Sequence, residues 1–275
     1  MKLTKQDILS CQLHDKQTGI WYLGQEGFLL KSGSSHLAVD LYLSDYVDRH
    51  CCDFVKWERL YAPPIDAAEL HFLDVVLCTH THYDHADPST LEQLAKGNPT
   101  TKFVIPAPEA ATIAAYGIAT ENIMPAVAWK RIEVAGYEII PVPSAHEALH
   151  PDENGNYKEL GYIIRTNGKT FFHAGDMCMY DGLIASLRPY AVDVAFLPIN
   201  GRDYFRNRDD IIGNFSCEEA VLLAKEIGAD MLVPMHHDLY TVNRVRTAHF
   251  VDAVDTLDPY RKYHIFAPGE LYIKE

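Results

Sequence analysis

The sequence is poor in the cysteine patterns that cross-link chains or bind metals. Its six cysteines include no Cys-x-x-Cys pair and do not reach the density of a disulfide-built scaffold. Residues 1–10 alternate polar and aliphatic side chains, so they lack the continuous apolar run of a signal peptide or membrane span. These absences predict a reduced, cytoplasmic protein without a membrane partner.

Positive charge is also scarce. The chain has 24 Lys and Arg against 38 Asp and Glu, a formal net charge of −14. Proteins that bind nucleic acids normally carry a basic surface, because affinity comes largely from the phosphate backbone. The composition therefore argues against a nucleic-acid partner, although a local basic patch would still permit a nuclease.

Linkers, low-complexity stretches and internal repeats are absent from the 275 residues. Repeat architectures need a period of about 20–50 residues, and none is visible. With 48% hydrophobic residues the chain can bury a sizeable core. We expect one domain over residues 1–275.

Short apolar runs rich in Val, Ile, Phe and Tyr recur along the chain and predict strands. They cover residues 19–24, 28–31, 36–42, 75–79, 102–107, 131–143, 161–166, 170–175, 192–200, 231–236 and 263–267. Helical patterns lie between them, at residues 89–96, 216–228 and 245–257. In the second of these, Ser216 and Glu219 form a capping-box pattern and Gly228 supplies the stop. The alternation predicts a layered α/β fold with helices outside.

Histidine and aspartate gather directly after four of the apolar runs. The chain has 14 histidines, and the densest cluster is the run His80-Thr81-His82-Tyr83-Asp84-His85. The other three clusters hold His146, Asp176 and the pair His236-His237. Strand ends that carry such residues can converge on one rim, where imidazole and carboxylate suit zinc, manganese or iron.

The run His-x-His-x-Asp-His resembles the hallmark of the metallo-β-lactamase superfamily, and the later family motifs occur in the expected order. The resemblance implies a four-layer αββα sandwich. It also implies two divalent ions, Mn²⁺ or Zn²⁺. The ligands it implies are His80, His82 and His146 for one ion, Asp84, His85 and His236 for the other, and Asp176 between both.

A narrower resemblance is to the L-ascorbate-6-phosphate lactonase-like branch. It rests on Trp21-Tyr22-Leu23-Gly24-Gln25-Glu26-Gly27, on residues 200–205 and 211–214, and on residues 233–238. This resemblance implies a small, phosphorylated substrate and a place for Gln25 and Glu26 near the site.

Further residues are expected around the metal ligands. Arginine binds phosphate through paired hydrogen bonds. The stretch after residues 192–200 therefore predicts substrate contacts from Arg202, Asn200, Asp203 and Arg206. His173 and His237 are expected to support ligands rather than to bind metal themselves, with His236 preferred to His237.

The expected activity is hydrolysis of a small lactone or ester by a metal-activated hydroxide that Asp84 orients. A Gly-x-Ser-x-Gly nucleophile motif is absent. Two alternatives stay open: a phosphodiesterase or nuclease of the same fold, and a non-catalytic metal-binding protein on this scaffold. The sequence leaves a homo-oligomer open as well.

Overall fold

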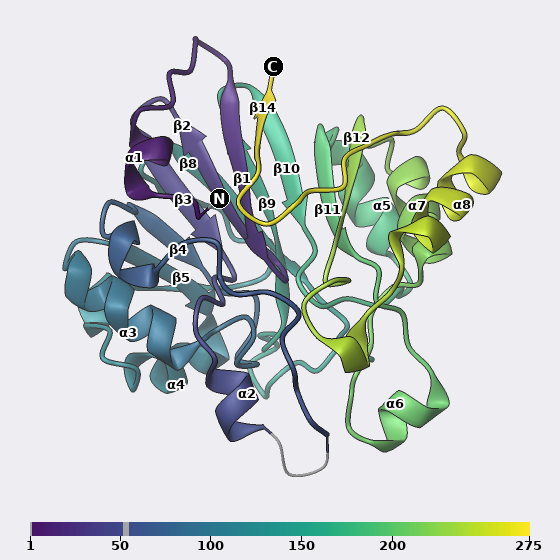
Figure 1. The fold of residues 1–275 in the computed structure, drawn as a ribbon, viewed down its shortest axis with the longest axis horizontal. Helices are drawn as coiled ribbons and strands as arrows, with labels where there is room; N and C mark the ends of the chain where they lie inside the picture. The colour runs from purple at the N-terminus through teal and green to yellow at the C-terminus, as the bar shows by residue number, and fades with distance from the viewer. Residues whose placement is uncertain (1, 52–54) are drawn as a thin grey trace.

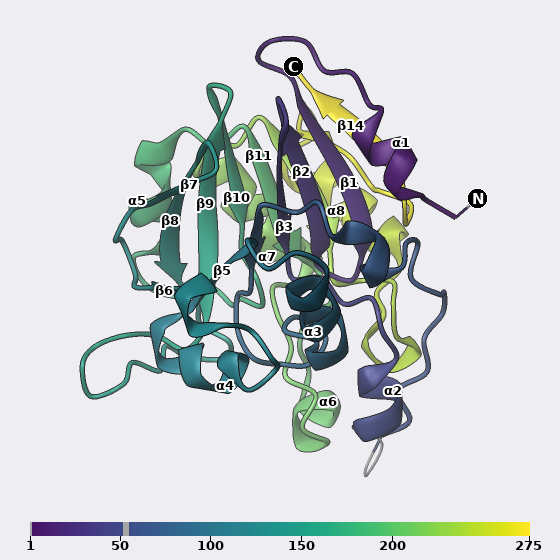
Figure 2. The ribbon, with the colours of Figure 1, turned by 90° about the vertical axis from the view of Figure 1, so that its left-hand side faces the viewer.

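The computed structural model describes residues 2–51 and 55–275 of the chain. In this part, two seven-stranded β-sheets pack face to face and helices cover the outer face of each (Figures 1 and 2). The α/β class and the four αββα layers expected from the sequence are thereby confirmed. No helix among the described residues combines the length and apolar character that crossing a bilayer would require.

Each sheet is built mainly from one half of the chain. The first sheet runs from edge to edge through β14 (Leu271–Lys274), β1 (Thr18–Gly24), β2 (Gly27–Ser32), β3 (Ser35–Val39), β4 (Val75–Leu77), β5 (Lys102–Pro106) and β6 (Ile123–Ala126). The second sheet runs through β13 (Lys262–Tyr263), β12 (Met231–Met235), β11 (Val194–Pro198), β10 (Lys169–His173), β9 (Leu160–Thr166), β8 (Tyr137–Pro143) and β7 (Ile132–Val134).

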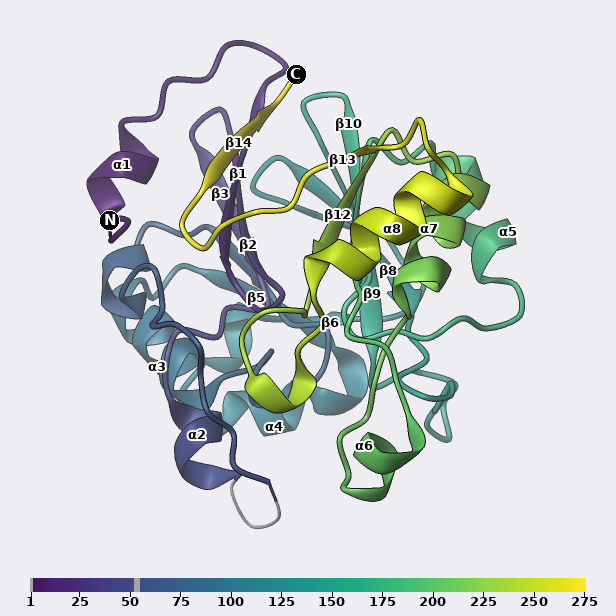
Figure 3. The same ribbon diagram turned by 45° about the vertical axis from the view of Figure 1, so that its right-hand side comes forward.

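The helices divide into three groups. On the side of the first sheet lie α1 (Lys5–Leu9), α3 (Pro88–Gly97) and α4 (Ala110–Ala114). On the side of the second lie α5 (Leu183–Leu187), α7 (Cys217–Glu226) and α8 (Thr247–Leu257) (Figure 3). The remaining two, α2 (Tyr46–His50) and α6 (Tyr204–Arg208), extend from the lower edge of the sandwich in Figures 1 and 3.

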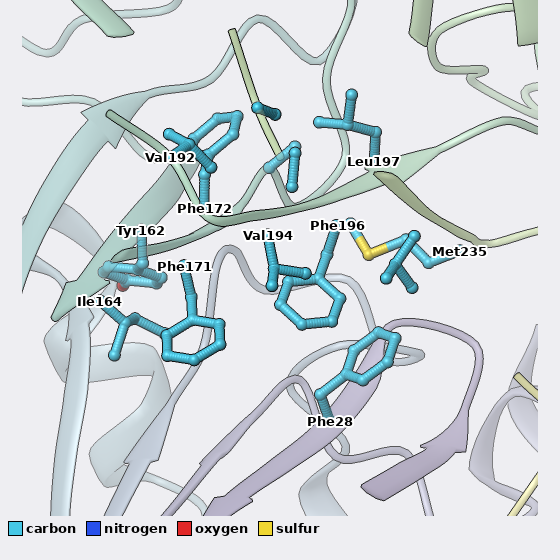
Figure 4. Close-up of a cluster of buried hydrophobic side chains, with 14 of the residues drawn as sticks. Phe28, Tyr162, Ile164, Phe171, Phe172, Val192, Val194, Phe196, Leu197 and Met235 are labelled. Carbon is cyan, nitrogen blue, oxygen red and sulfur yellow. The ribbon is translucent and has the colours of Figure 1, made fainter. Parts of the chain in front are cut away.

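Aromatic side chains fill the space between the two sheets (Figure 4). Phe28 of β2 meets Phe196 of β11 with ring centroids 4.4 Å apart, and Phe171 of β10 lies in the same fully buried cluster. Burying one such side chain contributes about 1.5–3 kcal/mol. The cluster therefore fixes the two sheets against each other and holds their edges in register.

The strand directions bring the carboxyl ends of several strands to one edge. Strands β3 to β6 are parallel, as are β10 to β13, and two successive antiparallel pairings make β1 parallel to β3 and β8 parallel to β10. Chain segments that leave these strands therefore meet at the edge from which α2 and α6 extend.

Two expected strands are wrong. Of residues 263–267, only Tyr263 lies in a strand, as the last residue of β13. Residues 131–143 form a hairpin of β7 and β8 rather than a continuous strand. Ala135 and Gly136 join them, with φ of 48° and 81°. Two successive residues with positive φ are typical of the tight turn that matches strand twist.

The capping box expected at the start of α7 is confirmed. Ser216 Oγ accepts a hydrogen bond from the backbone NH of Glu219, and the Glu219 side chain accepts one from the Ser216 NH.

Candidate metal centre

The seven residues expected to bind metal lie together at the carboxyl edge of the two sheets. The first run follows β4, and the other three ligands follow β8, β10 and β12. Their candidate ligand atoms form two groups, and within each group the atoms lie within 4.8 Å of one another. The groups are His80, His82, His146 and Asp176, and Asp84, His85 and His236.

Asp176 lies between the two groups. Its Oδ2 is 3.4 Å from His146 Nε2 and 3.7 Å from His80 Nε2, which belong to the first group. The same oxygen is 3.5 Å from His85 Nε2, and Oδ1 is 3.4 Å from His236 Nε2, both in the second group. This is the position that a carboxylate needs to serve both groups.

The protonation of the site suits metal binding. Burial lowers the pKa of the His146 imidazole to about 4 and that of His80 well below its usual value, so both stay neutral. Burial alone would raise the pKa of Asp176, but His236, His85 and His146 outweigh it, and the net pKa lies well below the usual range. Neutral imidazole and ionised carboxylate are the forms that bind divalent ions.

His85 shows that the site attracts positive charge. Burial lowers its pKa, yet the carboxylates of Asp176 and Asp84 outweigh burial and the net pKa is raised. A metal cation would be attracted by the same carboxylates that favour this proton. The fully buried Nε2 of His85 has no hydrogen-bond partner within the described chain, and it lies 3.6 Å from Asp84 Oδ2. The residues therefore fit divalent ions bound through nitrogen and oxygen.

Two residues outside the predicted ligand set hold the second group in place. Asp40, at the end of β3, accepts from His85 Nδ1 at 2.9 Å, which turns Nε2 toward the centre. Gln25, at the end of β1, donates from Nε2 to Asp84 Oδ2 at 2.8 Å and lies 3.1 Å from His236 Nε2. The expectation of Gln25 near the site came from the branch resemblance, whereas the sequence offered no signal for Asp40.

Three buried asparagines form a second supporting chain. Asn214 Nδ2 donates to Asp176 Oδ1 at 2.7 Å and also to Asn200 Oδ1 at 3.0 Å. Asn200 Nδ2 in turn donates to Asn243 Oδ1 at 3.0 Å, which also accepts from Arg206. Asn200 is 1% exposed, and its side-chain amide bonds to Asn214 and Asn243 within the protein.

The backbone is unusual where these supporting residues sit. Gln25, Asp40 and His236 have φ of 58°, 46° and 54°, a region that non-glycine residues rarely adopt. Gly175, just before Asp176, has φ of 62°, and a Cβ there would approach Thr79 to 2.8 Å. Glycine therefore lets the β10 segment pass close to the one that carries His80.

His173 has no free nitrogen for a metal. Its Nε2 donates to the backbone oxygen of Glu26 at 2.9 Å, and its Nδ1 accepts from the NH of Gly175 at 3.2 Å. It therefore supports the turn before Asp176, in line with the expectation. His237 is 4% exposed and belongs to neither ligand group in the described residues, whereas His236 does.

The charged residues expected to bind substrate form ion pairs with other residues of the protein. Arg202 donates from both terminal nitrogens to Glu219, each at 2.7 Å, and also to the Asn214 carbonyl at 2.8 Å. Asp203 caps α6 and pairs with Arg206. None of these three is among the described residues that line the cleft over the site. The structure thus gives no support for a phosphate-binding Arg202.

A cleft of about 470 Å³ opens onto the metal centre, and its lining includes residues of α2 and of the segment that follows α6. His82, Asp84, His146, Asp176 and His236 form its floor. Its walls are formed by Val47, Cys51, Val55, Trp57, Thr81, Tyr83, Asp209, Asp210, Ile211, Ile212 and Asn243. A small molecule entering this cleft would reach both ligand groups.

A family model described as "Beta-lactamase superfamily domain" matches residues 51–237. A UPF0173 metal-dependent hydrolase of Saccharolobus solfataricus is 26% identical over 238 residues, covering 85% of this chain and 90% of that protein. A UPF0173 metal-dependent hydrolase of Nitratidesulfovibrio vulgaris is 25% identical over 258 residues, covering 92% of this chain and 94% of that protein. The solved structure of Igni18, a metallo hydrolase from Ignicoccus hospitalis, aligns with a TM-score of 0.67 at 20% identity, covering 94% of this chain and 99% of the other.

Proposed function

The chain belongs to the β-lactamase superfamily, and on that basis we propose that it is a metal-dependent hydrolase that cleaves an ester or lactone bond in a small molecule. The curated relatives described above carry the name metal-dependent hydrolase. The observation that carries the proposal is the position of Asp176, whose two oxygens face histidines of both ligand groups at 3.4–3.7 Å.

In this proposal His80, His82 and His146 would hold one divalent ion and Asp84, His85 and His236 the other, with Asp176 shared. Two bound ions would lower the pKa of a water molecule and polarise the substrate's carbonyl oxygen. The protein's own part is to orient the ligands. Asp40 fixes which nitrogen of His85 faces the centre, and Gln25 restrains the carboxylate of Asp84 that lies on the floor of the cleft.

An ester or lactone fits this cleft better than a phosphodiester. Polyanionic substrates need positive side chains along their path, and the cleft walls carry Asp209 and Asp210 instead. A non-catalytic role is disfavoured because all seven ligand positions hold metal-binding side chains. The sugar-phosphate lactone suggested by the branch resemblance loses its main support, since Arg202 is bound to Glu219.

The test is a metal-dependent activity screen. Protein purified without chelator is analysed for bound metals, then assayed on aryl esters, lactones and an aryl phosphodiester. The assays are repeated after chelation and after Zn²⁺ or Mn²⁺ is returned. We expect ester or lactone hydrolysis that chelation removes and metal restores. Asp176→Ala should abolish it, whereas His249→Ala, at an exposed histidine of α8, should not. Hydrolysis of the phosphodiester alone would refute the proposed bond type.

A further inference from the structure

Part of the wall of the cleft above the metal centre is apolar. Val47 of α2 lines it with Val55 and Trp57, which follow α2 in the chain, and with Ile211 and Ile212, which follow α6. Apolar walls recognise the shape of a hydrocarbon group and gain free energy by removing it from water. The polar groups of the cleft are the metal ligands on its floor and Thr81, Asp209, Asp210 and Asn243 in its walls.

The described residues that line the cleft include no Lys or Arg. Two arginines reach the wall through other residues, since Arg208 pairs with Asp209 and Arg206 donates to Asn243. The wall itself carries Asp209 and Asp210. A substrate that brings a negative charge would therefore find no basic side chain among the described lining residues, and it would meet two carboxylates, of which Asp209 is paired with Arg208.

The arginines around the cleft are committed elsewhere. Arg208 donates to both carboxylate oxygens of its neighbour Asp209, at 2.8 and 3.1 Å. Arg202 is held by Glu219, as described above. On the opposite side, the guanidinium of Arg59 lies 4.5 Å from the centre of the Tyr42 ring and donates to backbone carbonyls. Each of these cations is turned into the protein or onto a neighbouring side chain.

We propose that the substrate of this cleft bears an apolar group and no negative charge, and that the apolar group packs between Trp57 and the Ile211-Ile212 pair. This inference rests on the proposed function for the scissile bond, but its evidence comes from the walls and not from the metal centre. It excludes the phosphorylated lactones suggested by the branch resemblance. It leaves a neutral or cationic apolar ester, lactone or related carbonyl compound.

Three matched nitrophenyl esters test the proposal. They share one chain length and end in a tert-butyl group, a trimethylammonium group or a carboxylate, so that the first two match in shape and differ in charge while the third carries a negative charge. On zinc-loaded protein we expect kcat/KM for the first two to exceed that for the carboxylate ester by about 10-fold or more. A carboxylate ester that is hydrolysed as well as the tert-butyl ester overturns the proposal.

Substitutions in the walls connect the preference to the named residues. Ile212→Ala should lower kcat/KM for the tert-butyl ester by about 10-fold, because the wall loses the atoms that contact the apolar group. Asp210→Asn should raise the rate with the carboxylate ester relative to the trimethylammonium ester by about 2- to 5-fold, the range of an exposed charge pair. The control is Asp255→Asn on α8, which removes the same charge far from the cleft. If neither wall variant differs from this control, the assignment is wrong.

A binding measurement separates this inference from the hydrolase proposal. Hexyltrimethylammonium has an apolar chain, no negative charge, no hydrolysable bond and no metal ligand. Calorimetric titration should detect its binding to wild-type protein and to Asp255→Asn, with weaker binding to Ile212→Ala. If it binds in this pattern while none of the esters is hydrolysed, the cleft assignment stands and the hydrolase proposal fails. If it does not bind and the esters are not hydrolysed, both are overturned.

Discussion

Replacing Asn214 by alanine should weaken both metals, although Asn214 is not a ligand itself. Its amide donates to Asp176 Oδ1 at 2.7 Å, and that oxygen also faces His236 at 3.4 Å. A hydrogen bond to a charged group contributes about 1.5–3 kcal/mol. Without it, Asp176 can turn away from the position between the two ligand groups. Loss of such outer contacts typically reduces metal affinity about 10- to 100-fold.

The assay is competition between the protein and a chromophoric chelator, which reports the affinity of each metal separately. We expect Asn214→Ala to lower the affinity for both ions by about 10- to 100-fold. Asn200→Ala should lower the affinity less, because Asn200 reaches Asp176 only through Asn214. Asn154→Ala, at an exposed position in the segment between β8 and β9, serves as the matched control. Wild-type affinity for both metals in Asn214→Ala, with only a lowered melting temperature, would refute the argument.

Three other substitutions give distinct expectations. Asp176→Ala should lower the occupancy of both metals in elemental analysis, whereas His85→Ala should mainly empty the second group; equal losses would contradict the division into two groups. Burial lowers the pKa of His36 from 6.5 to about 4. Between pH 6.5 and pH 4, His36 is therefore protonated in the unfolded chain but neutral in the folded chain. Folding stability should therefore fall as pH drops through this window, by up to about 3 kcal/mol, and His36→Leu should show a flatter urea-unfolding profile, which an unchanged slope would contradict. Arg202→Gln should lower the melting temperature by about 2–4 °C, as expected for a half-exposed ion pair, and Glu219→Gln should lower it similarly without an additive loss in the double variant.

The ligand set could be predicted from the sequence because its residues occur in clusters. His80, His82 and His85 lie within six residues, and their spacing after an apolar run predicts a rim site. His146 and Asp176 came from the resemblance, which matched single residues by order along the chain. The structure brings these residues together, as expected for strands whose carboxyl ends meet at one edge.

The sequence suggested Gln25 near the site and Asn200 as a substrate contact, but it did not predict the hydrogen-bonded supporting roles of the four residues below, for a physical reason. Asp40, Asn200, Asn214 and Asn243 stand alone in the chain, and an isolated Asp or Asn is more often a turn or surface residue. Their roles depend on long-range hydrogen bonds, such as the one between Asn214 and Asp176, 38 residues apart. Likewise, residues 131–143 read as one apolar run, and only the backbone angles of Ala135 and Gly136 reveal the turn inside it.

A helix cap fixes the position of one arginine near the cleft. Glu219 is fixed at the start of α7 because its carboxylate accepts from the Ser216 NH at 2.9 Å, completing the capping box. The same carboxylate accepts hydrogen bonds from both terminal nitrogens of Arg202. The residue that caps the helix therefore also directs the arginine away from the cleft. The sequence displays the cap and the arginine separately, 17 residues apart. Arg202, which the sequence suggested as a phosphate ligand, instead forms an ion pair with Glu219. The cleft walls above the metal centre are thus left without this arginine and favour an apolar substrate that has no negative charge.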